Sequence, residues 1–462
     1  MIRKRTLLAI ASLLVISGCK VGPNYQRPTV TVPPQYRGGA PDLTNQPAAP
    51  SIAETQWGGV FQDEVLKGLI KEALTNNYDI RIAATRILQA EANVGVVRSN
   101  QLPTLNGGVG VQNQRNTLNP GAPTFDTVGI SLDYILDFWG QYRRATEAAR
   151  AQLLATRFAQ DIVQTTLVSS VASQYYALRQ FDAQYEFAKQ SVTADNEILR
   201  INTIKFKGGE SAVTDVYQAQ LLVQQSEAEV ITVKQSIEQT ENQISILLGR
   251  NPGPIDRGLA LIDQPHLAEV PTGLPSALLQ RRPDIQRAEQ NLVSANANVG
   301  VAKAAFFPQI SLTGTFGAQS TSLTSFLQGP ATFWAVGGQI AQPLYNGGRI
   351  RSQYRLAWAQ RDEAELAYKQ TVQVAFGDVA SSLVGYNQSR LYRMKLQEQT
   401  NTYKQTADLA NVRFLGGVTS FLEVLVTQQQ YFTSELVLAE AWNAEMQNYV
   451  QLYQALGGGW QP

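Results

Sequence analysis

The stretch 127-TVGISLDYILD-137 alternates apolar residues with small or polar ones, apart from Ile135. A period of two with one apolar face and one small, polar face predicts a β-strand. The segments near 104–114, 309–318 and 333–345 alternate in the same way, so the sequence predicts four strands, the first stretch forming the strand at 125–137. Each segment is close to the ten or so residues that a tilted strand needs to cross hydrocarbon.

Aromatic residues flank these strands, as at a bilayer interface. They are Phe125, Phe138, Trp139, Phe306, Phe307, Phe326, Phe333 and Tyr345. Four strands cannot close a barrel, and each backbone amide left unpaired in lipid costs several kcal/mol. If the strands are transmembrane, several chains must share one barrel. The alternation by itself leaves open a half-buried soluble sheet with one wet face.

The chain contains two related halves. The motif ANVGV at 92–96 recurs at 297–301, and KFKGG at 205–209 parallels RFLGG at 413–417. Asp215 in the first half then corresponds to Glu423 in the second. We therefore expect a first repeat at 57–249, a Pro- and Gly-rich connector at 250–282, a second repeat at 283–456 and a tail at 457–462.

Long helices account for most of each repeat. Segments without proline or glycine predict helices at 141–205 and 210–248, and the repeat places their counterparts at 349–413 and 420–456. Val216, Val223 and Val230 begin a row of branched residues at every seventh position, and a mostly small row follows three positions later. Such a heptad seam predicts close helix packing with left-handed supercoiling. The helices alone are equally compatible with an antiparallel coiled-coil stalk.

The N-terminus carries a targeting signal. Arg3, Lys4 and Arg5 precede a short apolar run, 7–16, that ends before Ser17-Gly18-Cys19. This pattern resembles the lipobox of bacterial lipoproteins, which implies a signal peptide at 1–18, cleavage before Cys19 and acylation of Cys19. Lys20 at the next position suggests delivery to the outer membrane. An ordinary secretory signal with a chance cysteine is the alternative, and residues 19–56, rich in proline, are expected to form an extended tether.

Composition excludes several classes of function. The 462 residues carry 38 basic and 37 acidic side chains, so no basic excess points to nucleic acid. One cysteine and one histidine, His266, leave no cluster for a transition-metal site, and no metal or cofactor is expected. No nucleotide-binding or hydrolase motif appears, so the chain is not expected to be an enzyme; a hydrolase with an unrecognised site is the alternative.

Three motifs carry a resemblance to one family. The segments 19-CKVGPNY-25, 278-LLQRRPDI-285 and 298-NVGVAKA-304, the last leading into 306-FFPQISL-312, resemble outer membrane factor lipoproteins, the TolC-type exit ducts of tripartite efflux pumps. The resemblance implies an α+β membrane protein: a homotrimer with a twelve-stranded transmembrane β-barrel, four strands per chain, continuous with a periplasmic barrel of twelve helices. It also implies a passive duct in the bacterial outer membrane, anchored by lipid, for drugs, solvents or metal ions.

The same resemblance names the partners: a periplasmic adaptor protein and an inner-membrane RND-type transporter. Adaptor docking is expected at the turns between the long helices. These turns contain Gly208, Gly209, Glu210 and Ser211 in the first repeat and Gly416, Gly417, Val418 and Thr419 in the second. A lipid-anchored coiled-coil scaffold without a pore and a duct for protein secretion are the alternative functions.

Charges beside these turns predict a gate. Threefold symmetry would gather three copies each of Asp215 and Glu423, and like carboxylates in a narrow ring repel unless basic groups pair with them. Lys205, Lys207 and Arg413 across the turns are the candidate partners. We therefore expect a latch of ion pairs at the periplasmic end, with an apolar constriction from Leu422 and Val426.

Overall fold

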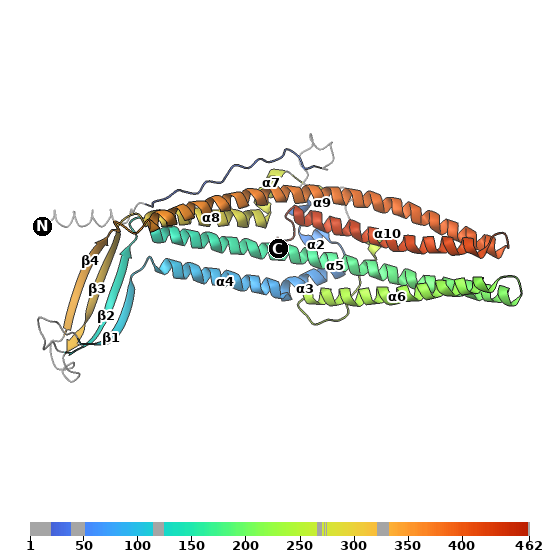
Figure 1. Ribbon diagram of the computed structural model, residues 1–462, viewed down its shortest axis with the longest axis horizontal. Helices are drawn as coiled ribbons and strands as arrows, with labels where there is room; N and C mark the ends of the chain where they lie inside the picture. Colours follow the sequence, from blue (N-terminus) through green and yellow to red (C-terminus); the bar gives the residue numbers. More distant parts are fainter. Residues whose placement is uncertain are drawn as a thin grey trace. The chain divides into compact units, whose positions relative to one another are not determined.

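A computed structural model describes residues 20–37, 51–113, 124–265, 270–271, 273, 275–320 and 332–460. The predicted signal peptide, Cys19, His266 and Phe326 lie outside these residues. Figure 1 shows the strands and the long helices of the chain. Their bounds are α3 Glu64–Asn76, α4 Tyr78–Ser99, β1 Thr104–Asn113, β2 Thr124–Leu136, α5 Gln141–Lys207, α6 Val213–Leu247, α7 Pro275–Arg281, α8 Pro283–Ala304, β3 Gln309–Ser320, β4 Thr332–Ala341, α9 Arg349–Leu415 and α10 Phe421–Ala455, with short helical turns η2 Ile52–Glu54, α2 Trp57–Val60 and η3 Leu261–Asp263.

The two halves of the chain fold into the same elements. Helices α5 and α9 each have 67 residues, and α6 and α10 each have 35. At a rise of 1.5 Å per residue, α5 and α9 are each about 100 Å long. Helices α4 and α8 also match, with 22 residues each. The internal repeat seen in the sequence is therefore a structural repeat.

The four strands form one antiparallel sheet in the order β1-β2-β3-β4. The two repeats join in its middle, where β2 pairs with β3 from Asp126↔Ser320 to Leu136↔Ile310. Among the described residues, β1 therefore has a strand partner on one side only, and so does β4. The four strands and the long helices predicted from the sequence are present.

Side chains on this sheet are exposed to an unusual degree. Val109, Trp334 and Val336 have 83%, 75% and 79% of their surface exposed within one chain. The prediction for the fourth strand was too long, because β4 ends at Ala341 and Leu344 lies beyond it. Pro343 explains the difference, since a proline has no amide hydrogen to donate to a neighbouring strand.

The chain divides into two compact units, and each unit takes residues from both repeats. One contains the described residues of 1–30, 85–157 and 287–370, and the other those of 31–84, 158–286 and 371–462. In the first, the sheet is accompanied by α4, α8 and the first part of α5, where the small residues Ala148, Ala151 and Ala155 are buried. Among the described residues, no helix has the length and hydropathy that crossing a bilayer requires.

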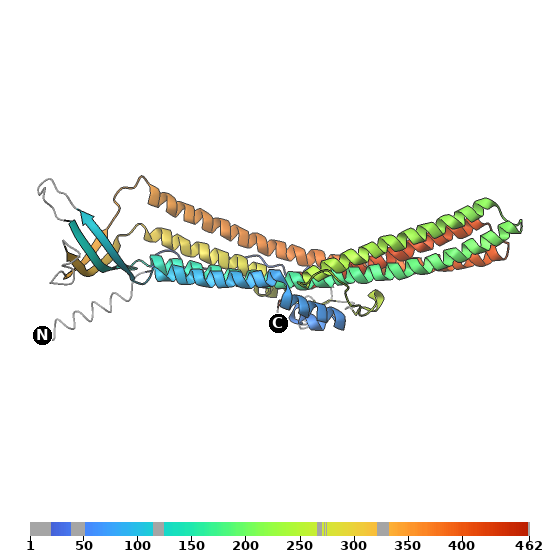
Figure 2. The ribbon, with the colours of Figure 1, turned by 90° about the horizontal axis from the view of Figure 1, so that it is seen from below.

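The second unit contains the two helical hairpins, α5–α6 and α9–α10. Both views show the hairpin loops at the same end of this unit (Figures 1 and 2). The predicted heptad seam is buried on α6, where Ala219, Ser226, Val233 and Thr240 follow one another at seven-residue spacing. These small residues allow the helices to approach closely.

The N-terminal residues 20–27 form no helix or strand, and they pack within the first unit. The Arg144 guanidinium, 1% exposed, donates to the carbonyls of Val21 and Gly22 and to the side chain of Asn24. Tyr25 donates to the Glu289 carboxylate at 3.0 Å. We call residues 20–27 the N-terminal strap.

Candidate functional site at the hairpin turns

Both hairpins reverse through the same capping motif. In the first, the Glu210 amide donates to the Lys205 carbonyl at 2.8 Å and the Gly209 amide to that of Phe206 at 3.0 Å. In the second, Val418 donates to Arg413 at 2.9 Å and Gly417 to Phe414 at 3.1 Å. These 6→1 and 5→2 bonds form a Schellman motif, which satisfies the last carbonyls of a helix.

The two glycines of each turn have different roles. Gly209 and Gly417 have φ values of +79° and +71°, a left-handed conformation that favours glycine. Gly208 has an ordinary φ, and a Cβ added to it would lie 3.5 Å from the nearest carbonyl oxygens, in normal contact. Only the second glycine of each pair is therefore required by the turn.

A hydrophobic cluster joins the ends of all four helices. It contains Ile198, Ala219, Leu222, Ala410, Phe414, Phe421 and Val424. The rings of Phe414 and Phe421 lie 5.6 Å apart between centroids. The two hairpins therefore form one packed end, which we call the tip.

One of the ion pairs predicted from the sequence is present in the second repeat. The Arg413 guanidinium lies 2.8 Å from the Glu423 carboxylate, and the Thr419 hydroxyl donates to the other oxygen of Glu423. Both side chains of this ion pair are more than one third exposed, so solvent weakens it.

The first repeat has no such pair. Among the residues that the structure describes, none forms an ion pair or hydrogen bond with the Asp215 carboxylate. Lys205 does not contact Asp215: its ammonium lies 3.9 Å from the Phe414 ring centroid and donates to the Phe414 carbonyl at 3.2 Å. The lysine thus links the first hairpin to the second.

The two residues predicted to form an apolar constriction have exposed side chains. Leu422 and Val426 lie four residues apart on α10, which places them on one face of the helix. They are 58% and 44% exposed in one chain. Val418 in the turn is also exposed. The tip therefore offers unpartnered apolar surface close to the ion pair.

Sequence reasoning missed one buried acid below the tip. Asp195 on α5 is buried, and the Ser226 hydroxyl from the heptad seam of α6 donates to it. Burial raises the pKa of the Asp195 carboxyl, while the Ser226 hydrogen bond acts in the opposite direction. Ser226, a polar residue in the mostly small row of the heptad seam, could have indicated this contact, because a buried serine needs a hydrogen-bond partner.

This arrangement of a four-stranded sheet and long helical hairpins is that of outer-membrane channel proteins. The model of the family described as "Outer membrane efflux protein" matches residues 69–250 and 274–458. The chain therefore belongs to the outer membrane efflux protein family, and it is an outer-membrane component of an efflux pump that assembles with other pump proteins.

Named relatives resemble the chain over nearly its full length. The solvent efflux pump outer membrane protein SrpC of Pseudomonas putida is 34% identical and covers 98% of each chain. The cation efflux system protein CusC of Escherichia coli is 32% identical over 98% of this chain and 99% of its own. A crystal structure of CusC, described in connection with transmembrane channel formation, superposes with a TM-score of 0.86 at 30% identity, over 96% of this chain and 100% of the other.

Proposed function

We propose that three copies of the chain form one twelve-stranded barrel and act as a passive exit duct. The open sheet carries this proposal, because no described residue of the chain pairs with the outer edges of β1 and β4. An unpaired strand edge in lipid costs several kcal/mol for each amide, so each edge must pair with that of a neighbouring chain. The exposed Val109, Trp334 and Val336 would then face lipid.

Cargo and partners follow from the relatives and from the tip. Two relatives are named for solvent and cation efflux, which supports small molecules as cargo here. A periplasmic adaptor would dock at the turns 208–211 and 416–419, and an inner-membrane RND-type transporter would supply the energy. Two features support docking at these turns. Val418 is apolar and exposed, and Gly208 and Gly416 have no side chain to hinder the approach of another protein.

Acylation of Cys19 would anchor the chain in the outer membrane. The strap supports this proposal, since Lys20 lies against Gly140 between β2 and α5. The residue that follows the proposed anchor is therefore held where the strands end.

Purified protein tests the assembly. We expect a trimer that resists dissociation in detergent and gives steady conductance steps in planar bilayers. A monomeric, water-soluble rod without conductance would instead select the scaffold without a pore. Binding to an adaptor involved in protein export, with no change in drug, solvent or metal sensitivity after gene deletion, would select the secretion duct.

The gate in this proposal is the ion pair of Arg413 and Glu423, together with the apolar face of Leu422 and Val426. A surface ion pair contributes about 0.2–1 kcal/mol, so three related pairs would shift the balance of open and closed tips by up to about a hundredfold. Adaptor binding would open the tip by replacing these contacts. Asp215 would add negative charge to the closed end without pairing.

Single-channel recording tests the gate. Glu423→Gln should raise the open fraction or the conductance, and Arg413→Glu combined with Glu423→Arg should restore the closed behaviour. Glu210→Gln is the matched control, since it removes a carboxylate from the same tip that has no ion-pair partner among the described residues. Unchanged conductance in both Glu423→Gln and the pair Asp215→Asn with Glu423→Gln would count against the latch.

A further inference from the structure

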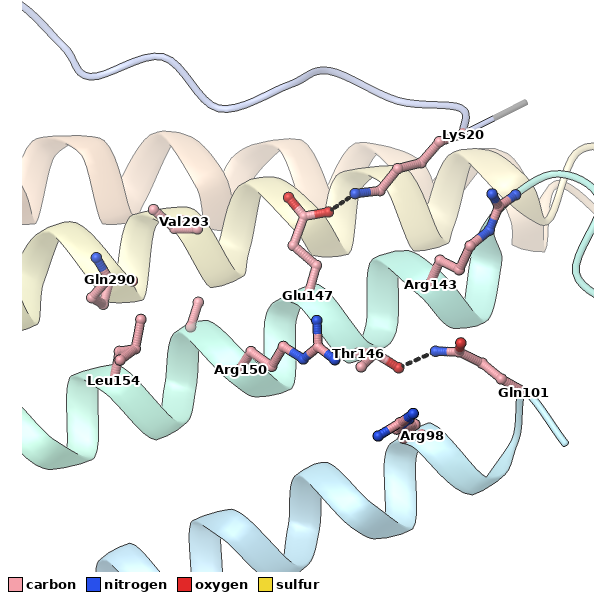
Figure 3. Close-up of a pocket in the computed structure, with 11 residues that line it drawn as sticks. Lys20, Arg98, Gln101, Arg143, Thr146, Glu147, Arg150, Leu154, Gln290 and Val293 are labelled. Carbon is pink, nitrogen blue, oxygen red and sulfur yellow. Dashed lines mark hydrogen bonds and ion pairs between the residues drawn. The ribbon is translucent and has the colours of Figure 1, made fainter. Parts of the chain in front are cut away.

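A basic pocket lies beside the end of the sheet. It has a volume of about 400 Å³ and is lined by side chains from α4, α5 and α8 and by Lys20 of the strap (Figure 3). Its basic lining residues are Lys20, Arg98, Arg143 and Arg150, and Glu147 is the one carboxylate. Leu154 and Val293 form an apolar part of the lining, away from Arg98 and Arg143 in Figure 3.

Carboxylates of the chain do not neutralise this pocket. Glu147 pairs with Lys20 and also with the buried Arg144, at 3.1 Å. Arg143 pairs with Asp137 at 3.3 Å. Lys20 and Arg144 therefore share the single negative charge of Glu147, which leaves one net positive charge.

Two arginines in the pocket are unpaired. Arg98 on α4 and Arg150 on α5 line the same space, and neither guanidinium has a hydrogen bond or ion pair with any residue that the structure describes. Adding them to the excess around Glu147 gives the site three net positive charges. Gln101 at the rim donates its side-chain amide to the Thr146 hydroxyl and to the Tyr142 carbonyl, and it adds no charge.

The position of the pocket indicates the environment of its ligand. The Lys20 backbone lies 3.1 Å from a Cβ built on Gly140, the residue just before α5, and the Val21 amide donates to the Trp139 carbonyl at 3.1 Å. Trp139 stacks on Phe307 with centroids 4.5 Å apart. Paired aromatic rings at strand ends mark the level of lipid headgroups.

We propose that this pocket binds the phosphate diester of an anionic phospholipid from the periplasmic leaflet, an assignment that rests on the proposed membrane-spanning trimer. Arg98 and Arg150 hold the phosphate oxygens through charge-assisted hydrogen bonds, for which guanidinium is well suited. Basic pockets between helices at a membrane surface bind lipid headgroups in this way.

The ligand is a lipid separate from the proposed anchor. A diacylglyceryl thioether on Cys19 carries no phosphate, so it offers the two arginines no anion. Lys20, next to Cys19 in the chain, brings the anchor and the phospholipid to neighbouring positions. The pocket would thereby fix the rotation of each chain relative to the membrane surface.

Native mass spectrometry of the lipidated trimer tests the proposal, with phosphatidylglycerol and phosphatidylcholine as probes. We expect phosphatidylglycerol to bind at one site per chain and more tightly than phosphatidylcholine. In the double variant Arg98→Gln, Arg150→Gln, affinity for phosphatidylglycerol should fall at least about tenfold, the effect of losing about 1.4 kcal/mol of binding energy. The double variant Arg86→Gln, Arg355→Gln is the matched control, since it removes two exposed arginines of the same unit outside the pocket.

Each other outcome overturns the lipid assignment. Undiminished phosphatidylglycerol binding by the pocket variant, or an equal loss in the control, would exclude a specific site. Displacement by inorganic phosphate at the same concentration would identify a free anion as the ligand. A less stable trimer with unchanged lipid binding would show that a neighbouring chain's carboxylate covers the two arginines.

Conductance in planar bilayers separates this proposal from the proposed function. If the variant Arg98→Gln, Arg150→Gln conducts like wild type but still binds phosphatidylglycerol, the proposed duct stands and the proposed lipid site is refuted. Wild-type protein that neither forms trimers nor conducts would remove the duct itself.

Discussion

The second glycine of each hairpin turn offers a sharp test of the tip geometry. Gly209 has a φ of +79°, and a Cβ built on it meets no atom within 4 Å. Replacing it with alanine therefore changes the backbone preference without a clash. An L-residue pays about 1–2 kcal/mol in the left-handed region. Gly208 is the internal control, because its φ lies outside the left-handed region, where replacing glycine with alanine stabilises by about 0.4–1 kcal/mol.

The two substitutions should differ by about 2 kcal/mol in the free energy of opening the turn, or close to thirtyfold in local exchange. We would measure amide hydrogen exchange by mass spectrometry on the trimer, using peptides that cover 204–212. Gly209→Ala should speed exchange in this segment, whereas Gly208→Ala should leave it unchanged or slow it. Gly417 and Gly416 should repeat the contrast in the second hairpin.

Asparagine adds a further check on the cause. It tolerates the left-handed region better than alanine does, so Gly209→Asn should recover part of the lost protection. Equal exchange in Gly208→Ala and Gly209→Ala would refute the assignment of the strain to the second glycine. It would mean that the tip owes its shape to the Phe414 and Phe421 cluster and not to the turn.

Three further predictions concern buried polar groups. Asp195→Asn should raise the melting temperature at pH 7 but not below about pH 4. Burial raises the pKa of the Asp195 carboxyl above its ordinary 3.8, so the folded protein loses stability as the pH rises above about 4 and through that raised pKa. Asparagine stays neutral and avoids this loss. Asp63→Ala should cost about 3–5 kcal/mol, seen as a lower melting temperature, since this buried carboxylate accepts bonds from Tyr175, Leu259 and Gln264 at 2.8–2.9 Å. Arg144→Met should make the strap cleavable by added protease, and an unchanged digestion pattern would contradict its role.

Much of this fold could be predicted because the spacing of apolar residues shows which face of a single strand or helix is apolar. The strands could be recognised from their alternating residues, since the sheet has a distinct apolar face. Strand β1 begins at Thr104, as expected. The helix ends could be placed because glycine marks a Schellman turn. The predicted bounds were 205 and 210, whereas α5 continues to Lys207 and α6 begins only at Val213. The extra residues are those whose amides and carbonyls complete the turn.

Contacts between distant segments could not be predicted from the sequence. The partner of Lys205 is a ring and a carbonyl 209 residues away, and helical periodicity does not reveal which neighbour a face meets. Arg144 reads as an ordinary charge near a helix start, yet it holds the strap through backbone carbonyls. Carbonyl groups exist at every residue, so no sequence signal distinguishes the ones that are used.

The two repeats show how one backbone supports two different contacts. Lys205 and Arg413 are equivalent positions, and so are Asp215 and Glu423. Arginine closes the second hairpin on its own glutamate, while the lysine crosses to Phe414 and leaves Asp215 unpaired. A ring built from three such chains would therefore alternate latched and unlatched hairpins. Opening such a ring would need only the three latched hairpins to change, because the unlatched ones are held through Lys205 and would follow them.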